Sequence, residues 1–390
     1  MMHHTPVAPV VRLRAPLLGA ILVVATYCHV VFWPIFTTDV FNDYVPWYNH
    51  VVERGVPAAF AAPFGAYTPP YLYGLALMVP FKGLLPDTVI IKLLSMLGNV
   101  ALGAAFWHLL KRLRVPMAPR YAAMLLALPS VMMNAALLGQ CDAMYVAPCV
   151  MALAAAVDRK HRVMLAWCGI ALAFKAQAVL LAPFILALLI ARRVPFWHWF
   201  AAPLAFLAAM LPAWAAGWPA DDLLTIYFRQ ADTFHEIARN SPNIWMILEV
   251  AGINTGSLTL LAMAATIGTV GAYVARLSVT ARYLSTPMLL RAATLAPLIT
   301  AGLLPRMHER YFLIADVFSL ALALISNDRA TWWIPALVQT GSTLALLAYL
   351  TGIPALAAIG AVAMIAATCL TAQPWLARSA NDNPVMPRRA

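Results

Sequence analysis

Long apolar runs separated by short polar loops follow one another along almost the whole chain. Most runs are long enough to cross about 30 Å of hydrocarbon as a helix. The pattern predicts about twelve spans, at residues 16–36, 88–110, 118–137, 143–157, 163–176, 178–191, 197–217, 257–276, 288–304, 310–326, 331–350 and 353–372. No polar block is large enough to fold separately, so we expect one all-α transmembrane domain over residues 1–377. The polar segment 378–390 is expected to be a disordered cytoplasmic tail.

Composition supports this class of protein. The 390 residues are 63% hydrophobic and only 11% charged, with a mean hydropathy of +0.80, which excludes an ordinary soluble domain. The first apolar run is too long for a signal-peptide core and precedes no small-residue cleavage site, so we expect a retained helix. The five cysteines show no CxxC or metal-ligand spacing, so neither a disulfide framework nor a zinc site is expected.

The net charge of +11 has a topological explanation. Basic clusters such as 111-KRLR-114 fall in alternate loops, and most acids fall in the others, as the positive-inside rule requires. The basic loops and both termini are then cytoplasmic, and two long loops, 37–87 and 218–256, face outward. Segment 69–85 would reverse this pattern if it crossed the membrane, so we expect an interfacial or re-entrant helix there. The charge therefore gives no reason to expect a nucleic-acid partner.

Ionisable residues and two glutamines near the membrane gather on the predicted outer side. Such residues are costly in a membrane and usually line a pathway or a cavity. Asp39 and Asp43 follow the first span. The remaining members lie at helix ends, in 139-GQCD-142, 174-FKAQ-177 and 305-PRMHERY-311: Gln140, Asp142, Lys175, Gln177, Arg306, His308, Glu309 and Arg310. We therefore expect one polar pocket at this face.

Structural alternatives exist for several of these residues. Asp142 can cap the helix that follows it, Lys175 can extend toward the interface, and residues 308–310 can form a local salt-bridge cluster. The Tyr-rich stretch 67-YTPPYLYG-74 fits either a surface that grips a substrate or an ordinary aromatic belt. Arg239 is interpreted as a surface charge of its loop.

Six motifs together resemble a known group of enzymes. In order and shared outward location, they are similar to GT-C glycosyltransferases, especially bacterial relatives of the GPI mannosyltransferase II group. The motifs are 39-DVFNDYVPWY-48, 67-YTPPYLY-73, 139-GQCD-142, 174-FKAQ-177, 242-PNIW-245 and 305-PRMHERYF-312. The resemblance covers residues 10 to about 326. It implies a GT-C helical bundle whose first outer loop carries interfacial helices and an essential Asp, and a polyprenyl-phosphate-linked sugar as donor.

The resemblance also assigns residues. The family spacing to Trp47 places the essential Asp at Asp39, whereas Asp43 stands where the family more often has an apolar or aromatic residue. No DxD-type metal motif is present in the sequence, so we expect no metal requirement and no other cofactor.

Transfer from a lipid phosphate needs a base for the acceptor hydroxyl and cations for the departing phosphate. We expect Asp39 to be the base, with Asp43 in support. His308, Arg310, Lys175 and Arg306 are expected to bind the donor phosphate, the first three in that order of preference. The residues expected to contact substrate elsewhere are Gln140, Asp142, Gln177, Glu309, Tyr67, Tyr71, Tyr73, Trp47, Asn243 and Trp245.

The two carboxylates also bear on stereochemistry. Retention needs carboxyl groups about 5 Å apart across the sugar. If that loop is helical, Asp39 and Asp43 are one turn apart and share one face of the helix, so inversion is favoured.

We therefore expect an inverting membrane glycosyltransferase with its site facing the exterior of a bacterial inner membrane. It would move a hexose or pentose, with a mannose-type sugar favoured, from a polyprenyl phosphate to a lipid, glycan or protein acceptor. The alternative is a transporter or flippase of a lipid-linked sugar, which commonly shows an internal repeat and polar groups near the midplane. No repeat is evident in the sequence, and its polar groups lie toward one face, so the enzyme is favoured.

Overall fold

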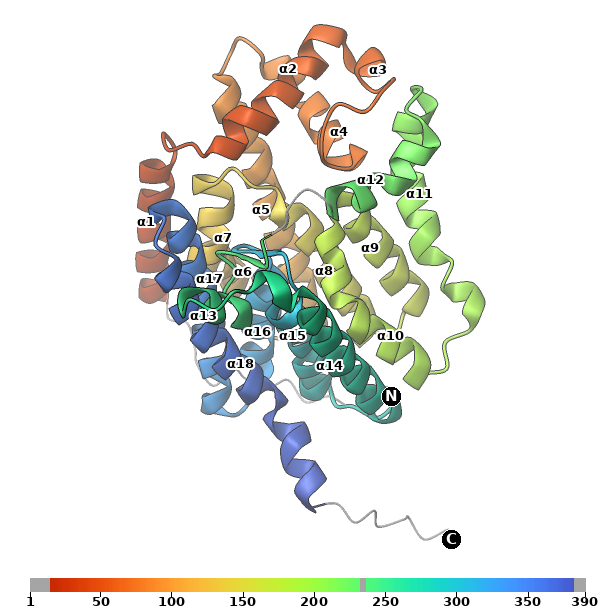
Figure 1. Cartoon of the computed structure of the whole chain (residues 1–390), viewed down its shortest axis with the longest axis vertical. Helices are drawn as coiled ribbons and strands as arrows, with labels where there is room; N and C mark the ends of the chain where they lie inside the picture. The colour runs from red at the N-terminus through yellow and green to blue at the C-terminus, as the bar shows by residue number, and fades with distance from the viewer. Residues whose placement is uncertain (1–14, 232–235, 382–390) are drawn as a thin grey trace.

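The fold is a bundle of helices with a smaller helical layer over one end (Figure 1). The computed structural model describes residues 15–231 and 236–381. Within these residues the chain is almost entirely helical, and the sheet content is a single pair of two-residue strands. This architecture confirms the predicted all-α membrane bundle.

Seven helices in the described residues are long and apolar enough to cross a membrane. Some include a short 3₁₀ turn at their start, namely η5 (Phe196–His198), η6 (Gly256–Leu258) and η7 (Arg329–Trp332). The seven are α1 (Ala15–Phe32), α5 (Asp87–Arg112), α11 (Ala201–Ala215), α14 (Thr259–Thr280), α15 (Thr286–Leu303), α17 (Trp333–Thr351) and α18 (Pro354–Asn381).

The other predicted spans correspond to shorter or broken helices. Four apolar segments of 10–17 residues are α8 (Asp142–Val157), α9 (His161–Phe174), η4 (Ala176–Leu181) with α10 (Ala182–Ala191), and α16 (Leu313–Ile325). The remaining span is a pair of helices bent by 59°, formed by α6 (Ala118–Leu126) and by α7 (Pro129–Met132) with η3 (Met133–Leu137). Each of the twelve predicted segments thus coincides with a helical segment of the structure.

Prolines explain the two clearest boundary differences. The first helix was expected to reach residue 36 but ends at Phe32, just before Pro34. The predicted helix 118–137 is broken ahead of Pro129, where Leu128 has extended backbone angles. A proline lacks the N–H that a helix interior needs and disfavours helical angles in the residue before it.

The layer over the bundle is formed by residues 40–81, called the cap below. It contains η1 (Val40–Tyr44), α2 (Val45–Arg54), α3 (Val56–Ala59), α4 (Pro69–Leu77) and η2 (Val79–Phe81). The cap has its own buried core, in which Tyr48 and Leu72 pack with Ile91 of α5. With only nine residues, α4 is too short to cross a membrane, which agrees with the predicted interfacial helix.

The loop after α11 carries two helices and a strand. These are α12 (Ala220–Ala231), β1 (Ala238–Arg239) and α13 (Ile244–Val250). Strand β1 pairs in parallel with β2 (Met307–His308), with Arg239 opposite His308. The short sheet therefore joins two loops that are about seventy residues apart in sequence.

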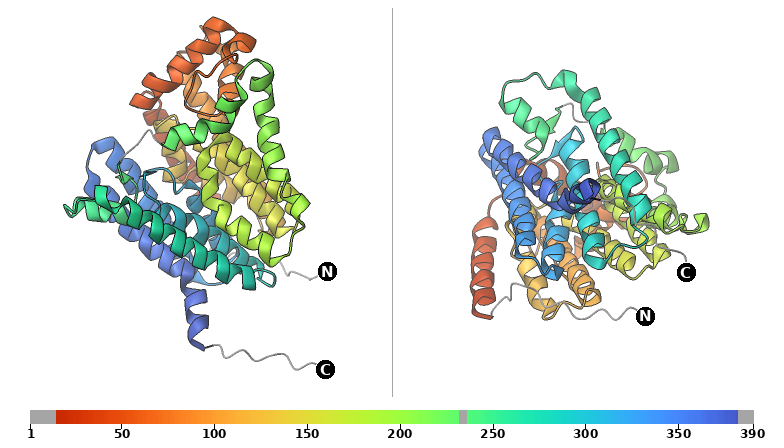
Figure 2. Two further views of the ribbon diagram at one scale, coloured as in Figure 1. Left: turned by 45° about the vertical axis from the view of Figure 1, so that its right-hand side comes forward. Right: turned by 90° about the horizontal axis from the view of Figure 1, so that it is seen from below.

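Burial divides the helices into inner and outer ones. Every residue of α16 is buried, so this helix lies at the centre. Few residues of α1, α11 and α14 are buried, and α1 stands at the edge of the bundle (Figure 2). Large apolar side chains on such helices are expected to face lipid. At the end remote from the cap, α18 extends to Asn381, past the predicted domain boundary at 377; the rest of the predicted tail, 382–390, lies outside the described residues.

Candidate active site

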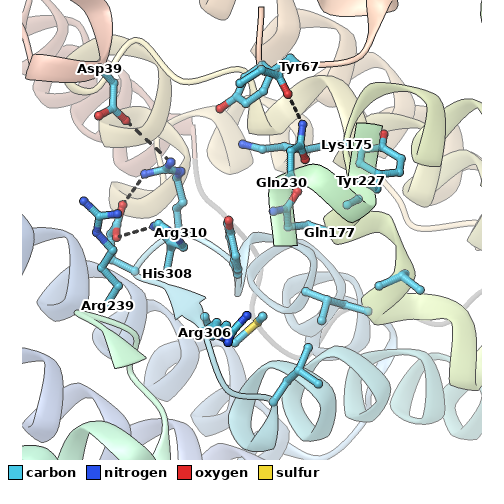
Figure 3. A pocket seen from close by; sticks show the side chains of 18 of the residues that line it. Asp39, Tyr67, Lys175, Gln177, Tyr227, Gln230, Arg239, Arg306, His308 and Arg310 are labelled. Atoms are coloured by element: carbon cyan, nitrogen blue, oxygen red, sulfur yellow. Dashed lines mark hydrogen bonds and ion pairs between the residues drawn. The ribbon is translucent and has the colours of Figure 1, made fainter. Parts of the chain in front are cut away.

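A cavity of about 720 Å³ lies between the cap and the bundle. Its walls come from the cap, the break between α9 and η4, α12, the start of α14, and the loop between α15 and α16. Figure 3 shows several of the polar side chains that point into it. The predicted site residues that line it are Asp39, Asp43, Trp47, Tyr67, Lys175, Gln177, Arg306, His308, Glu309 and Arg310.

Asp39 is oriented by a chain of hydrogen bonds. Its Oδ2 accepts a hydrogen bond from Nε2 of Gln140 at 2.7 Å, and the Tyr44 hydroxyl donates to Oε1 of Gln140 at 2.6 Å. Nη2 of Arg310 lies 3.8 Å from the same carboxylate oxygen. The Asp39 side chain is 31% exposed, whereas Gln140 is buried behind it. The carboxylate is therefore held in place but open to the cavity.

Asp43 also lines the cavity, from an exposed position in η1. Partial burial, and secondly the negative charge of Asp39, raise the pKa of Asp43. The two carboxylates thus occupy unlike surroundings.

Asp142 and Lys175 form an ion pair in the interior. Their side chains are 0% and 7% exposed, and Asp142 also accepts a hydrogen bond from Nδ2 of Asn134 at 2.7 Å. Asp142 is the first residue of α8 and Cys141 is its N-cap, so the Asp142 side chain serves the ion pair and does not occupy the cap position. Lys175 does not extend to the interface, because it is buried and its ammonium lies 5.0 Å from the centre of the Tyr67 ring.

The Arg310 guanidinium lies close to three carboxylates. Its Nη1 lies 2.5 Å from Oε1 of Glu309, and its Nε lies 3.6 Å from Oδ2 of Asp142. With Asp39 at 3.8 Å, one guanidinium is surrounded by three acids. Close opposite charges of this kind stabilise one another where water is excluded.

The surroundings of His308 disfavour the charged form of its ring. Burial, and then the positive charges of Arg310, Arg239 and Lys175, lower the pKa of His308 to about 2. A neutral ring would serve a phosphate as a hydrogen-bond donor and not as the positive charge that the sequence predicts for His308. It retains one N–H that can donate a hydrogen bond.

Arg239 requires a correction. It was interpreted as a surface charge, but it lies on β1 opposite His308 and lines the cavity. Arg239 and Arg306 thus add two guanidinium groups to the wall that also holds Arg310 (Figure 3). The pairing of β1 with β2 places Arg239 there, and no local pattern in the sequence indicates that pairing.

Four predicted substrate contacts lie away from the cavity. Tyr71 is fully buried in the cap, and the hydroxyl of Tyr73 accepts a hydrogen bond from the backbone N–H of Ala213 at 2.8 Å. Asn243 caps α13, and Trp245 donates from Nε1 to the Leu303 carbonyl at 2.7 Å. These four residues pack or cap helices, and the structure does not bring them to the cavity where substrate contacts were expected. Gln140 and Asp142 do not line the cavity either, but they bind residues that do.

The sequence reasoning missed Tyr44, Tyr227 and Gln230, which also line the cavity. Tyr44 lies 3.0 Å from the Tyr67 hydroxyl, oxygen to oxygen. Tyr227 and Gln230 are three residues apart on α12, so they share a helix face. That spacing was a weak signal, because polar residues three apart are common on exposed helices.

One wall of the cavity is apolar. It is formed by Val179 and Leu180 of η4, Met263 of α14 and Leu304. Because α14 is mostly exposed, this wall lies beside a helix expected to face lipid. The cavity therefore combines a charged wall with an apolar one.

In residues 15–231 and 236–381, no three His, Cys, Asp or Glu side chains gather closely enough to hold a metal ion.

The fold and this cavity define a polytopic integral membrane protein with a charged pocket between a helical cap and the bundle. No family model matches the sequence, and no curated protein matches it. Among solved structures, the chain resembles the crystal structure of ArnT from Cupriavidus metallidurans bound to undecaprenyl phosphate. The TM-score is 0.52 at 14% sequence identity, and the likeness covers 94% of this chain and 78% of that one. The chain thus has the GT-C fold.

Proposed function

We propose that this protein is a membrane glycosyltransferase that uses a polyprenyl-phosphate-linked sugar. The observation that carries the proposal is the cavity that holds a positioned carboxylate, several cations and an apolar wall beside a lipid-facing helix. The shared fold adds support, because ArnT was crystallised with undecaprenyl phosphate.

Asp39 is proposed as the general base. Its carboxylate is partly exposed to the cavity and is fixed by Gln140, so it can accept the proton of an acceptor hydroxyl. The acceptor oxygen then forms a bond to the anomeric carbon of the sugar. The bond from that carbon to the phosphate oxygen breaks, and the polyprenyl phosphate leaves with the electron pair. A single displacement of this kind inverts the anomeric centre.

The leaving phosphate is proposed to bind the cationic wall. Arg310 and Lys175 each have an acid partner within the cluster, and Arg306 and Arg239 add further positive charge on the same cavity. Fixed donors and charges that are already in place stabilise a developing anion without reorganisation. His308 can add one neutral N–H donor.

The remainder of the donor fits the other walls. The first part of the prenyl chain is proposed to lie along Val179, Leu180 and Met263 and to continue into the bilayer. Trp47 and Tyr67 are proposed to contact the sugar, since both line the cavity.

We further propose that the transferred sugar is a hexose or pentose, with mannose favoured by the resemblance to the GPI mannosyltransferase II group. The acceptor is a lipid, glycan or protein. We propose a bacterial inner membrane from the same resemblance, and the charge asymmetry of the loops supports an orientation with the cavity on the outer face and both termini in the cytoplasm.

A reconstituted assay tests the proposal. The purified protein in lipid vesicles is mixed with radiolabelled polyprenyl-phosphate mannose, glucose or a pentose, together with a membrane extract as the source of acceptor. The expected result is loss of label from the donor and its appearance in a new product. Intact donor that crosses the bilayer without turnover would instead identify a flippase and overturn the proposal.

A further inference from the structure

A fully buried lysine near the start of α5 contacts the chain just before Asp39 but does not line the cavity. Lys92 is on α5 and has no exposed surface. Its ammonium donates hydrogen bonds to the backbone carbonyls of Phe32, at 2.8 Å, of Trp33, at 3.1 Å, and of Ile35. Three N–H donors therefore meet three carbonyl oxygens. The same ammonium lies 4.6 Å from the centre of the Phe36 ring.

This contact lies at the end of the first helix. The last carbonyls of a helix have no partner within it and carry partial negative charge, so a cation there is favourable. Pro34 prevents the helix from continuing, because it has no N–H to donate. Lys92 supplies donors at this point and fixes the chain through Ile35, four residues before Asp39.

The same helix also holds the segment that carries Gln140. Ser95, one turn after Lys92, donates to the Gly139 carbonyl at 2.7 Å. Between the two segments, the Thr37 hydroxyl donates to the Leu138 carbonyl at 3.2 Å. Two segments about a hundred residues apart are therefore joined to each other and to α5.

The two segments are also tightly packed. Gly139 has a φ of +66°, and a Cβ built there would lie 3.0 Å from Cγ2 of Val40, the residue after Asp39. Asp39 precedes Val40 and Gln140 follows Gly139, so the Asp39–Gln140 hydrogen bond at 2.7 Å joins the immediate neighbours of these two residues. A shift of either segment would thus change the geometry of that hydrogen bond.

We propose that Lys92 is a positioning residue: by fixing the end of α1, it sets the Asp39 carboxylate against Gln140 and Arg310. Lys92 is absent from the cavity lining, so it acts through Asp39 and not on the substrate. The effect on turnover rests on the proposed function, whereas the effect on the position of Asp39 does not.

Cross-linking tests the position without any activity. The five native cysteines are replaced by Ala, and Asp39→Cys and Gln140→Cys are introduced into the full chain in lipid nanodiscs. A short thiol-reactive cross-linker then joins the two positions, and the intramolecular product is measured by mass spectrometry. In this background Lys92→Met is compared with Lys82→Met. Lys82 is a matched control, because it is an exposed lysine directly after the cap that pairs with Asp87 and Asn49.

We expect Lys92→Met to slow the cross-link by about tenfold or more, because joining two thiols needs a narrow range of separations. Lys82→Met should leave the rate unchanged. Equal rates in Lys92→Met and the parent would overturn the proposal. If Lys92→Met yields no monodisperse protein, Lys92→Gln, which keeps two N–H donors, is used with the same criterion and a smaller expected loss.

Kinetics give the second readout, in protein with the native Asp39. A catalytic group displaced by about 1 Å can lose on the order of 100-fold in rate. Lys92→Met should therefore lower kcat by about this factor and leave KM for the polyprenyl-phosphate sugar within about twofold, and Lys92→Gln should recover part of kcat. A raised KM with unchanged kcat would contradict a positioning role. If the unsubstituted protein transfers no sugar, the proposed function fails, and the cross-linking result still decides the role of Lys92.

Discussion

Removing both members of the Asp142–Lys175 ion pair should destabilise the protein by clearly less than the sum of the two single losses. The two side chains are 0% and 7% exposed, so a single substitution leaves a buried charge without its partner. Such changes typically cost about 3–5 kcal/mol, whereas neutral replacement of both members is often tolerated. The contacts that remain around each partner predict which of the two single substitutions lowers the free energy of unfolding more.

Lys175→Met leaves Asp142 with the Asn134 amide at 2.7 Å and Nε of Arg310 at 3.6 Å. We therefore expect the lower end of the range, about 3 kcal/mol. Asp142→Asn leaves Lys175 beside the Tyr67 ring, with its ammonium 5.0 Å from the ring centre, so its loss should be nearer 5 kcal/mol.

The assay is a double-mutant cycle on unfolding in mixed detergent micelles. The double variant Asp142→Asn/Lys175→Met should recover at least about 2 kcal/mol relative to the sum of the single losses, within the range for residues in contact. Lys82→Met is the control, because Lys82 and Asp87 are 38% and 25% exposed and such a pair contributes about 1 kcal/mol or less. Losses that simply add in the double variant would refute the reasoning.

Three further predictions concern the site, the topology and the packing. His308→Gln should have the same pH profile of activity as the unsubstituted protein between about pH 6 and 8, because the pKa of His308 is lowered to about 2. If His308 acted as a cation, the activity of the unsubstituted protein would fall as pH rises through about 6.5, and His308→Gln would not show this fall. Single cysteines at positions 53 and 87, in place of Glu53 and Asp87, should react with a membrane-impermeant reagent added to the same side of the membrane. Labelling of position 87 only after lysis would mean that segment 69–85 crosses the membrane. Gly169→Ala should cost about 2 kcal/mol or more, since its Cβ would lie 2.1 Å from a backbone oxygen of α11. Gly268→Ala, with nothing within 4 Å, is the control, and equal stability of the two variants would argue against this packing.

The helices could be predicted because apolar runs of membrane length are a strong local signal. The breaks were harder to predict. Pro34 and Pro129 lie inside otherwise continuous apolar runs, and a proline can either kink a helix or end it. Only the packing around each run decides between the two.

The site was predicted in part for a similar reason. Acids and cations at helix ends are visible in the sequence, and Asp39, Lys175 and Arg310 do meet at one cavity. By contrast, Arg239 reaches the cavity through a strand pairing, and Trp245 is used in packing against α15. Both outcomes depend on contacts between distant segments, which residue type and spacing do not encode.

Polar residues inside the apolar runs were the least predictable. Lys92 was read only as part of a span, although its ammonium holds the end of α1. Asp316, in the central helix α16, accepts hydrogen bonds from Gln339 at 2.6 Å and Ser342 at 2.9 Å, which joins α16 to α17. Such interhelical hydrogen bonds satisfy polar groups where water is excluded.

The most direct test of the account compares Asp39→Asn with Asp43→Asn in the reconstituted transfer assay, with donor binding measured in parallel. An amide keeps the shape of the carboxylate but cannot accept a proton. Asp39→Asn should therefore lower turnover by about 10² to 10⁴, the range of general base catalysis, and leave donor binding nearly intact. Asp43→Asn should retain measurable activity. An inactive Asp43→Asn beside an active Asp39→Asn would show that Asp43 is the base, and full activity in both variants would contradict the proposal that either carboxylate takes the proton.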